Sequence, residues 1–432
     1  MQRKIIDWLE KWKESKDRKP LILQGARQVG KTYSSLMFGK EYYKTTAYFN
    51  FESNKDLASI FDRDLDPERI IRELSVRSGQ TILKEHTLIF FDEIQACERA
   101  LTSLKYFNEN ANANGYHIIA AGSLLGVAVN REQYSFPVGK VDLKTLYPLD
   151  FEEFLIALDK EDMIGSIKEC FDKNSEFSLH NQAMDLYKIY LVTGGMPAAV
   201  KEYIEKKDFN FVLSTQKNIN DSYIADMAKY ATPHETTKIM AAFNSIPAQL
   251  AKENKKFQYK IIKSGARAYD YETPLDWLKS SGVIIKCNKC EEGKLPLSVY
   301  TDFNSFKVYM TDTGLLCSKI DIPANIILSD LPAFNNFKGA LTENYVAFSL
   351  SSSGHVIYYW ESKGQAEVDF VIQDKQGNII PIEVKAADNV RAKSLNQFIK
   401  KYNPIYAIRI SSKNFGFENN IKSVPLYATF LI

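Results

Sequence analysis

Eight consecutive residues near the amino terminus have the types and spacing of a phosphate-binding loop. They fit the pattern G-x-x-x-x-G-K-[ST], known as a P-loop. The glycines let backbone N–H groups curl around phosphate oxygens, and a helix that begins there favours the anion. Lys31 is expected to contact the β- and γ-phosphates of a nucleotide, and Thr32 to ligate Mg²⁺. The loop consists of Gly25, Ala26, Arg27, Gln28, Val29, Gly30, Lys31 and Thr32.

Two adjacent carboxylates follow an apolar strand further along the chain. Residues 88–93 read Leu-Ile-Phe-Phe-Asp-Glu. We expect Asp92 to bind Mg²⁺ through its water shell, and Glu93 to polarise the water that attacks the γ-phosphate. A solvated acidic turn is the common alternative, but it is disfavoured downstream of a P-loop. The two motifs together predict ATP and Mg²⁺ as ligands and ATP hydrolysis as the reaction.

Short apolar segments supply a parallel sheet that would position these residues. Residues 21–24 precede the P-loop as a buried strand, and residues 47–51 form a strand inserted between the two motifs. With Glu93, this insertion indicates the additional-strand, catalytic-glutamate type of P-loop ATPase. A further strand at 117–121 leads to Ser123, the candidate γ-phosphate sensor. A plain turn at the end of that strand explains Ser123 equally well.

A second set of charged residues lies in the last third of the chain. Strand periodicity places Glu383 and Lys385 on one face of residues 379–385, and Asp369 on the partner strand of the hairpin can reach the same point. Glu343, on a preceding helix, could add a ligand. Two carboxylates and a lysine make a site for a second Mg²⁺ or Mn²⁺, as phosphodiester hydrolysis requires. Alternation in a half-exposed hairpin also produces this pattern, so a purely structural origin stays open.

The surrounding elements predict two further structural regions. The last third reads as an α-β-β-β-α-β order, with its first helix over 337–350 and its last strand over 405–410. The middle of the chain reads as helices followed by strands, with a short helix at 273–279, and this order suits a winged helix. Winged helices insert a helix into DNA or act as structural spacers, and both alternatives stay open. Gly194 and Gly195 stop a helical stretch and are a candidate hinge.

Composition limits the class of protein. The 432 residues exceed one ordinary core, and 45% hydrophobic with 25% charged residues is typical of a globular protein. A net charge of +2 gives no general indication of nucleic acid. We expect no membrane segment and no apolar signal core. Five scattered cysteines favour the reducing cytoplasm, and the pair Cys287 and Cys290 is expected at a turn rather than at a metal.

These motifs resemble, across nearly the whole chain, a family of prokaryotic AAA-type ATPases with a conserved C-terminal domain of unknown function. The resemblance implies an ATPase joined to a winged-helix-like segment and to a domain similar to PD-(D/E)XK nucleases. Lys140 departs from the family pattern, which has Arg there, and would lose bidentate geometry if that position contacts nucleotide in trans. The segments that carry the resemblance are 18–32, 91–95, 121–123, 136–140, 147–149, 194–197, 307–316, 338–339, 367–369 and 383–385.

The expected fold class is therefore a multidomain α/β protein. It combines a P-loop ATPase with a parallel sheet, a helical and winged-helix middle, and a C-terminal restriction-endonuclease-like α/β domain. The leading functional hypothesis is an ATPase whose cycle controls a nuclease-like domain that acts on DNA. The alternative is an ATP-dependent regulatory or interaction protein with an inactive nuclease-like fold; a small-molecule kinase would not explain Glu93. A homo-oligomer stays open, and the expected domains are 1–155, 156–209, 210–298 and 299–432.

Overall fold

The structure is a computed structural model that describes residues 1–123, 136–362, 366–385 and 393–432. It divides into two compact units. The first comprises Met1–Tyr147 with Ser280–Gly282, and the second comprises Pro148–Lys279 with Val283–Ile432. Among the described residues, no helix combines the length and the apolar character that crossing a membrane requires.

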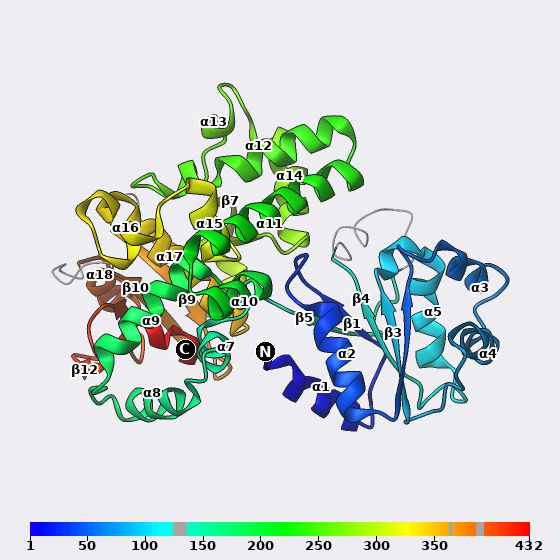
Figure 1. Cartoon of the computed structure of the whole chain (residues 1–432). Coiled ribbons are helices and arrows are strands. Elements are labelled where there is room, and N and C mark those ends of the chain that lie inside the picture. The colour runs from blue at the N-terminus through cyan, green and yellow to red at the C-terminus, as the bar shows by residue number, and fades with distance from the viewer. Residues whose placement is uncertain (124–135, 363–365, 386–392) are drawn as a thin grey trace. The chain divides into compact units, whose positions relative to one another are not determined.

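The first unit is built on a five-stranded sheet in the order β2-β3-β4-β1-β5, with every neighbouring pair parallel. Figure 1 shows α1 and α2 over one face of this sheet, and α3, α4 and α5 over the other. The elements are α1 (Ile5–Glu14), β1 (Leu21–Gln24), α2 (Lys31–Tyr42), β2 (Thr45–Asn50), α3 (Ser59–Asp62), α4 (Pro67–Ser78), β3 (Thr87–Asp92), α5 (Glu98–Glu109), β4 (His117–Ala121) and β5 (Asp142–Thr145).

The expected parallel sheet is confirmed, but one strand takes another place. The segment that we expected as the additional strand forms β2, which pairs only with β3 and so lies at the edge. The strand that separates the P-loop strand β1 from β3 is β4, which comes later in the chain. Parallel strands need crossover connections, so neighbours in sequence need not be neighbours in the sheet. Sequence order alone could not assign the central position.

The second unit begins with a helical region. Asp150 caps α7 with a reciprocal capping box, in which its carboxylate accepts from the Glu153 N–H while Glu153 accepts from the Asp150 N–H. The helix expected at 273–279 begins earlier, and Pro274 lies inside α14. The helices are α7 (Phe151–Ala157), α8 (Glu161–Lys173), α9 (His180–Thr193), α10 (Pro197–Lys206), α11 (Phe209–Tyr230), α12 (Pro233–Leu250), α13 (Tyr259–Ile262) and α14 (Ala268–Ser280).

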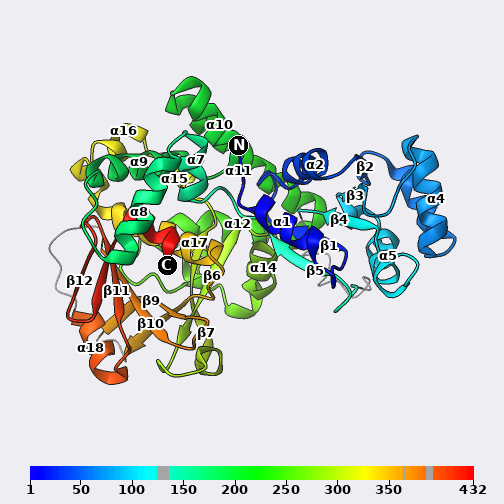
Figure 2. The same ribbon diagram turned by 90° about the horizontal axis from the view of Figure 1, so that it is seen from below.

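The rest of the second unit surrounds a mixed eight-stranded sheet in the order β12-β13-β11-β10-β9-β8-β6-β7. Figure 2 shows these strands side by side beneath α17. The elements are β6 (Ile284–Cys290), β7 (Thr301–Met310), α15 (Thr313–Ile320), α16 (Ala324–Leu328), α17 (Asn335–Ser352), β8 (Tyr358–Ser362), β9 (Ala366–Gln373), β10 (Ile379–Val384), α18 (Lys393–Tyr402), β11 (Ala407–Ser411), β12 (Gly416–Glu418) and β13 (Ile421–Pro425).

The expected α-β-β-β-α-β order is present from α17 to β11. The sheet, however, crosses the boundary expected at residue 298, because β6 pairs in parallel with β8 and β7 pairs with β6. The C-terminal third therefore shares its sheet with strands that precede it, and the four-domain division stays a prediction. Cys287 and Cys290 lie buried within β6, not at a turn as expected.

The Gly194–Gly195 pair is packed against other parts of the second unit. A Cβ on Gly195 would lie 1.9 Å from the Leu149 carbonyl oxygen, and one on Gly194 would lie 2.3 Å from Asp312 Oδ1. The Gly195 N–H donates to Asp312 Oδ2 at 2.6 Å. Burial raises the pKa of Asp312 to about 6, although backbone N–H groups, including that of Leu315, oppose this rise. These contacts account for both glycines by close approach, and the hinge is withdrawn.

Candidate functional site

The P-loop joins β1 to α2, as the pattern requires. Gly25 has φ +143°, and a Cβ there would lie 2.1 Å from the Leu146 carbonyl oxygen. Gly30 immediately precedes α2 with φ 96°, in the left-handed region that glycine adopts without strain. Both glycines are therefore required by the backbone. Lys31, the first residue of α2, is buried, and its ammonium donates to the carbonyl oxygens of Gly25 at 2.8 Å and Ala26 at 2.9 Å.

The two expected magnesium ligands lie together. The Thr32 hydroxyl donates to Asp92 Oδ2 at 3.0 Å, across 60 positions of sequence. Tyr48 donates to the same oxygen at 3.0 Å, and Asn50 lies 3.5 Å from it. Asp92 is 4% exposed, so three polar side chains from two neighbouring elements hold a buried carboxylate. Sequence analysis missed Tyr48 and Asn50, although both are polar residues near the end of β2.

Glu93 follows Asp92 at the end of β3, in a left-handed backbone conformation with φ 50°. Burial raises the pKa of Glu93, and a hydrogen bond from Gln95 and the charge of Lys31 oppose this rise. Gln95 Nε2 donates to Glu93 Oε2, which fixes the carboxylate. A raised pKa suits a group that accepts a proton near neutral pH. The local structure is therefore compatible with the role expected of Glu93.

Ser123 follows β4, the strand between β1 and β3, and it is buried. The sheet order therefore brings Ser123 to the same edge as the P-loop and Asp92, because parallel strands end at one edge. Its role as a sensor stays a prediction. Lys140 forms an ion pair with Glu109 at 3.1 Å, both side chains being more than one-third exposed. Such an exposed pair contributes about 0–1 kcal/mol.

The C-terminal carboxylates are arranged differently from the expected metal site. Glu343, on α17, accepts from Lys307 Nζ at 3.1 Å and from the Tyr309 hydroxyl at 2.5 Å. Lys255 forms an ion pair with the other oxygen of Glu343. Burial alone would raise the pKa of Glu343, but Lys255 and Lys307 outweigh it and lower that pKa to about 2. Glu343 is thus a buried carboxylate neutralised by two ammonium groups.

The other three residues of the predicted set lie on or just after the β9–β10 hairpin. The register of β9 and β10 ends at the Ile382–Phe370 pair, and Glu383 and Asp369 are the next residues on the two strands. Asp369 Oδ2 accepts from the Val384 N–H at 2.8 Å, and burial together with the charge of Glu343 raises the pKa of Asp369 to about 6. Lys385 Nζ lies 2.8 Å from Glu383 Oε1.

Asp369 therefore feels like-charge repulsion from Glu343, whereas Glu383 forms an ion pair with Lys385. Lys307, on β7, is paired with Glu343 on α17 and with Glu367 on β9. Burial would lower the pKa of Lys307, but these carboxylates outweigh it and raise the pKa. In the described parts of the chain, no group of three or more His, Cys, Asp or Glu residues is placed to hold a metal ion.

Sequence analysis missed the lysines that neutralise this cluster. Lys307 is the first residue of segment 307–316, one of the segments that carry the family resemblance, and this could have marked it. Nothing in the sequence, however, indicated that its charge would lie next to Glu343. Lys255 belongs to a polar stretch between α12 and α13 and carries no pattern that marks it. We call Lys255, Lys307, Glu343, Glu367 and Asp369 the buried charge cluster, after its buried members Lys307 and Glu343; the other three side chains are partly exposed.

Comparison with known proteins agrees with the geometry of the first site. Residues 17–155 match a family model described as an AAA domain. With its P-loop, its parallel sheet and the paired Thr32 and Asp92, this part of the chain is an AAA-type P-loop ATPase domain. Residues 184–325 and 338–429 match two models that are each described as a domain of unknown function, DUF8612 and DUF4143. No curated protein matches the chain.

Several solved structures have a related arrangement. A Walker-type ATPase of Pyrococcus abyssi is 15% identical with a TM-score of 0.43, over 74% of this chain and 95% of that one. The Aeropyrum pernix ORC1 protein in complex with DNA is 12% identical with a TM-score of 0.30, over 76% and 91%. The Thermotoga maritima RuvB Holliday junction branch migration motor is 13% identical with a TM-score of 0.32, over 68% and 88%. Because these TM-scores are all below 0.5, the structures do not support the class assignment. The assignment to the AAA-type P-loop ATPases comes from the match to the AAA domain model and from the geometry of the site.

The expected ATPase class is thus confirmed for the first unit, and so is a C-terminal domain of unknown function. The nuclease-like nature of that domain, the winged helix and the individual site roles stay predictions.

Proposed function

We propose that this chain hydrolyses ATP to ADP and phosphate with Mg²⁺ at the P-loop of its first unit. The observation that carries this proposal is the 3.0 Å contact between Thr32 Oγ1 and Asp92 Oδ2, because it joins the two groups expected to hold the metal. Thr32 would ligate Mg²⁺ directly, and Asp92 would bind its water shell. The ion would neutralise charge on the phosphate oxygens.

The remaining residues of the site have separate roles in this proposal. Lys31 exchanges its two carbonyl partners for the β- and γ-phosphates of ATP. Glu93, held by Gln95, orients the attacking water and accepts its proton as the new bond to phosphorus forms and the bond to the ADP oxygen breaks. Ser123 donates a hydrogen bond to the γ-phosphate and so senses its presence.

The test is steady-state ATP turnover as a function of Mg²⁺ for wild type, Thr32→Ala and Thr32→Ser. We expect turnover to require Mg²⁺, to fall at least tenfold in Thr32→Ala with a higher Mg²⁺ requirement, and to be largely retained in Thr32→Ser, which keeps the hydroxyl. Turnover in excess EDTA, or a Thr32→Ala variant with the Mg²⁺ dependence of wild type, would contradict the assignment.

For the second unit we propose the regulatory or interaction role rather than nuclease activity. The observation that favours it is the pairing of Glu343 with both Lys255 and Lys307, since a cation at this carboxylate would have to displace two ammonium groups. A lysine-neutralised cluster stabilises a specific arrangement of the sheet and α17 without a metal. In this proposal, the nuclease-like fold serves binding or structure.

The competing hypothesis is a DNA-acting nuclease with a second Mg²⁺ or Mn²⁺ at Glu343, Asp369 and Glu383, with Lys385 beside them. It is tested by incubating single- and double-stranded DNA with the purified chain, with each metal, and with and without ATP. We expect no strand breaks above those produced by Asp369→Ala prepared in parallel. Cleavage by wild type that is lost in Asp369→Ala would establish the nuclease instead.

A role for DNA or for self-assembly would be visible in the same ATPase assay. Stimulation of turnover by DNA would indicate a nucleic-acid partner. Turnover per chain that rises with protein concentration would indicate a homo-oligomer in which copies contribute to one another's sites. If assembly does so through Lys140, Lys140→Ala should lose the concentration dependence, whereas Lys140→Arg should keep it.

A further inference from the structure

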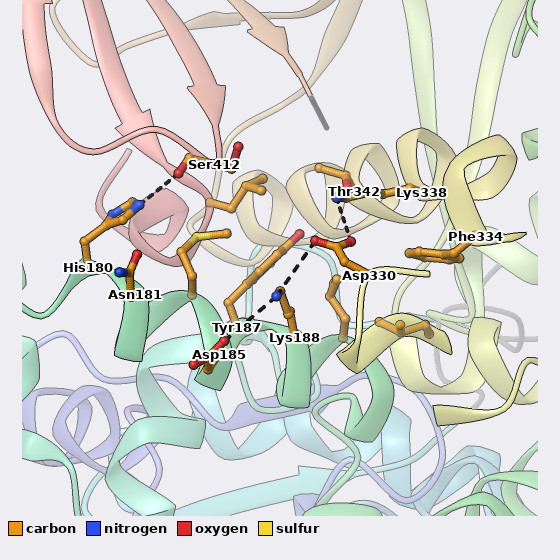
Figure 3. Close-up of a pocket in the computed structure, with 14 residues that line it drawn as sticks. His180, Asn181, Asp185, Tyr187, Lys188, Asp330, Phe334, Lys338, Thr342 and Ser412 are labelled. Atoms are coloured by element: carbon orange, nitrogen blue, oxygen red, sulfur yellow. Dashed lines mark hydrogen bonds and ion pairs between the residues drawn. The ribbon is translucent and has the colours of Figure 1, made fainter. Parts of the chain in front are cut away.

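The second unit contains a cavity that none of the proposed functions uses. Its volume is about 620 Å³, within the range of small-molecule sites. It is lined by α9 and by the segment from α16 to α17 (Figure 3), and also by Ser412 and Leu426. We call the buried part of its lining the floor. It consists of the side chains of Tyr187, Leu191, Ile327, Phe334, Thr342 and Leu426.

The rim of the cavity is charged but balanced. Lys338 donates to Asp330 at 2.7 Å, so this pair is satisfied. His180 is fixed as part of the wall, because its Nδ1 meets the Tyr427 hydroxyl at 3.1 Å and its Nε2 meets the Ser412 carbonyl oxygen at 2.9 Å. Since a carbonyl oxygen can only accept, Nε2 carries the proton and the Tyr427 hydroxyl donates to Nδ1.

Lys188 differs from the other charged groups of the rim. Its ammonium lies 3.8 Å from Asp330 and 3.9 Å from Asp185, which are distances for ion pairing but too long for hydrogen bonds. Across the described ranges, no hydrogen bond is recorded for Lys188, and its side chain is only one-quarter exposed. Figure 3 shows it between the two carboxylates at the edge of the cavity. The Lys188 ammonium can therefore donate hydrogen bonds to a ligand in the cavity.

Tyr187 supplies a second donor beside it. Its side chain is 2% exposed and extends from α9 toward α17 (Figure 3). Its hydroxyl makes no hydrogen bond of good geometry to any residue that the structure describes, although Thr342 lies close enough to act on its pKa. Burial raises that pKa, so the hydroxyl keeps its proton and remains a donor. A buried hydroxyl without a partner is unfavourable, and a ligand that accepts its hydrogen bond removes this cost.

We propose that this cavity binds a small organic acid, with its apolar or aromatic body on the floor and its carboxylate at Tyr187 and Lys188. Two donors without hydrogen-bond partners match the two oxygens of one carboxylate, and charge-assisted bonds to it would satisfy both. Phe334, Ile327 and Leu426 match an apolar body. Asp330 does not repel the anion strongly, because Lys338 already neutralises it.

The proposal is tested on the full chain without nucleotide, so that it is independent of ATP hydrolysis. Binding of 3-phenylpropionate and of its uncharged amide, 3-phenylpropionamide, is measured by ligand-observed NMR and calorimetry. We expect the acid to bind at least tenfold more tightly than the amide. We expect Lys188→Met and Tyr187→Phe each to weaken the acid about tenfold, because each keeps its apolar part and loses one donor.

Two control variants separate the cavity from general effects. Lys173→Met removes an exposed lysine on α8, and Tyr359→Phe removes another buried hydroxyl without a hydrogen-bond partner, outside the cavity. Both should bind the acid as wild type does. Equal binding of acid and amide, no binding at millimolar concentration, or wild-type affinity in Lys188→Met and Tyr187→Phe would overturn the proposal.

Discussion

The P-loop site of the first unit and the buried charge cluster of the second unit contain similar residues in opposite arrangements. Both have two or more carboxylates and a buried lysine. In the first, Asp92 is held by the hydroxyls of Thr32 and Tyr48, and the ammonium of Lys31 is held by backbone carbonyl oxygens. In the second, Glu343 is held by the two ammonium groups of Lys255 and Lys307.

This difference separates a site prepared for a ligand from a site that is complete by itself. Neutral partners keep a charged group ordered without cancelling its charge, so Lys31 can still attract phosphate and Asp92 can still attract Mg²⁺. Oppositely charged partners cancel the field that would attract an ion, and breaking such a buried pair is costly. Residue types alone therefore do not distinguish the two sites; the partners do.

The largest effect is expected for Lys31→Ala. In the proposed mechanism Lys31 supplies the ammonium group at the β- and γ-phosphates, so its loss should reduce ATP turnover by more than a hundredfold and weaken ATP binding. Turnover and fluorescent-nucleotide binding measure both effects. Lys16→Ala, which changes an exposed lysine shortly before β1, is the control and should behave as wild type. Near-normal turnover in Lys31→Ala would mean that Lys31 does not bind phosphate, and the contrast between the P-loop site and the buried charge cluster would then fail.

Glu93→Gln should separate binding from hydrolysis. The amide keeps the size of Glu93 and its contact with Gln95 but cannot accept the proton, so turnover should fall about 10²- to 10⁴-fold with ATP still bound. Because burial raises the pKa of Glu93, wild-type turnover should decline on the acidic side at a higher pH than an ordinary glutamate would give. A variant that turns over ATP at the wild-type rate would exclude Glu93 as the base.

Much of the first site could be predicted from sequence because its chemistry is local. Within the P-loop, eight consecutive residues determine a turn, a helix start and a phosphate cradle, and Asp92 with Glu93 directly follows a buried strand. The central position of β4 and the hydrogen bond from Tyr48 to Asp92 could not be predicted from the sequence. Both depend on which parallel strands become neighbours, and that is decided by packing of the whole sheet.

The second site was predicted less well because its decisive contacts are not local. Alternation placed Glu383 and Lys385 on one face and Asp369 within reach of the same point, since strand parity is a property of the sequence itself. The structure pairs the two strands up to Ile382 and Phe370, the residues next to Glu383 and Asp369. Lys255, however, reaches Glu343 across 88 positions, and Lys307 reaches it across 36. The sign of the field in that cluster depends on these distant lysines, so carboxylate spacing alone suggested a metal site.

Lys307→Met tests whether the buried charge cluster is complete without a metal. The substitution keeps an apolar stem of similar length but leaves Glu343 and Glu367 with less compensation. We expect the free energy of unfolding to fall by about 3–5 kcal/mol, measured by urea denaturation. The double variant Lys307→Met with Glu343→Gln should recover part of this loss, because position 343 then carries no buried charge to compensate; only part, because Lys255 and Glu367, which are partly exposed, each lose a partner.

The surface pair Lys173 and Glu169 is the matched comparison for that experiment. Its atoms lie 2.6 Å apart, but both side chains are about two-thirds exposed, so Lys173→Met should leave the free energy of unfolding unchanged within the error of the measurement. An equally small effect of Lys307→Met would mean that the buried cluster contributes no more than a surface ion pair. The proposed structural role of the cluster would then fail.

The smallest effect is expected from the titration of Asp369. Its pKa of about 6 in the folded chain is above the ordinary value near 3.9. Between about pH 4 and pH 6, the folded chain therefore keeps a proton that the unfolded chain has released. Linkage then requires the free energy of unfolding to decrease as pH rises through this window and to level off above it.

Asp369→Asn should remove this contribution, because the amide does not titrate. The raised pKa of Asp369 sets an upper limit of about 3 kcal/mol on this change, and structural relaxation with water entry reduces it, so we expect a change of about 1 kcal/mol. Asp312 has a similarly raised pKa and makes the free energy of unfolding depend on pH in both proteins. The quantity to compare is therefore the difference in unfolding free energy between wild type and variant at each pH. The measurement is urea denaturation at pH 4.5, 5.5 and 7.

Glu343 provides the internal check on the sign of this effect. Its pKa is lowered to about 2, so its contribution is present above about pH 4.5 and is lost as pH falls toward 2, outside the window of Asp369. Wild type and Asp369→Asn could instead show the same dependence of the unfolding free energy on pH between pH 4 and pH 7. In that case the pKa of Asp369 is not raised, and Asp369 is not the uncompensated carboxylate of the cluster. The two lysines would then neutralise Asp369 as fully as Glu343, and the contrast with the P-loop site would be sharper still.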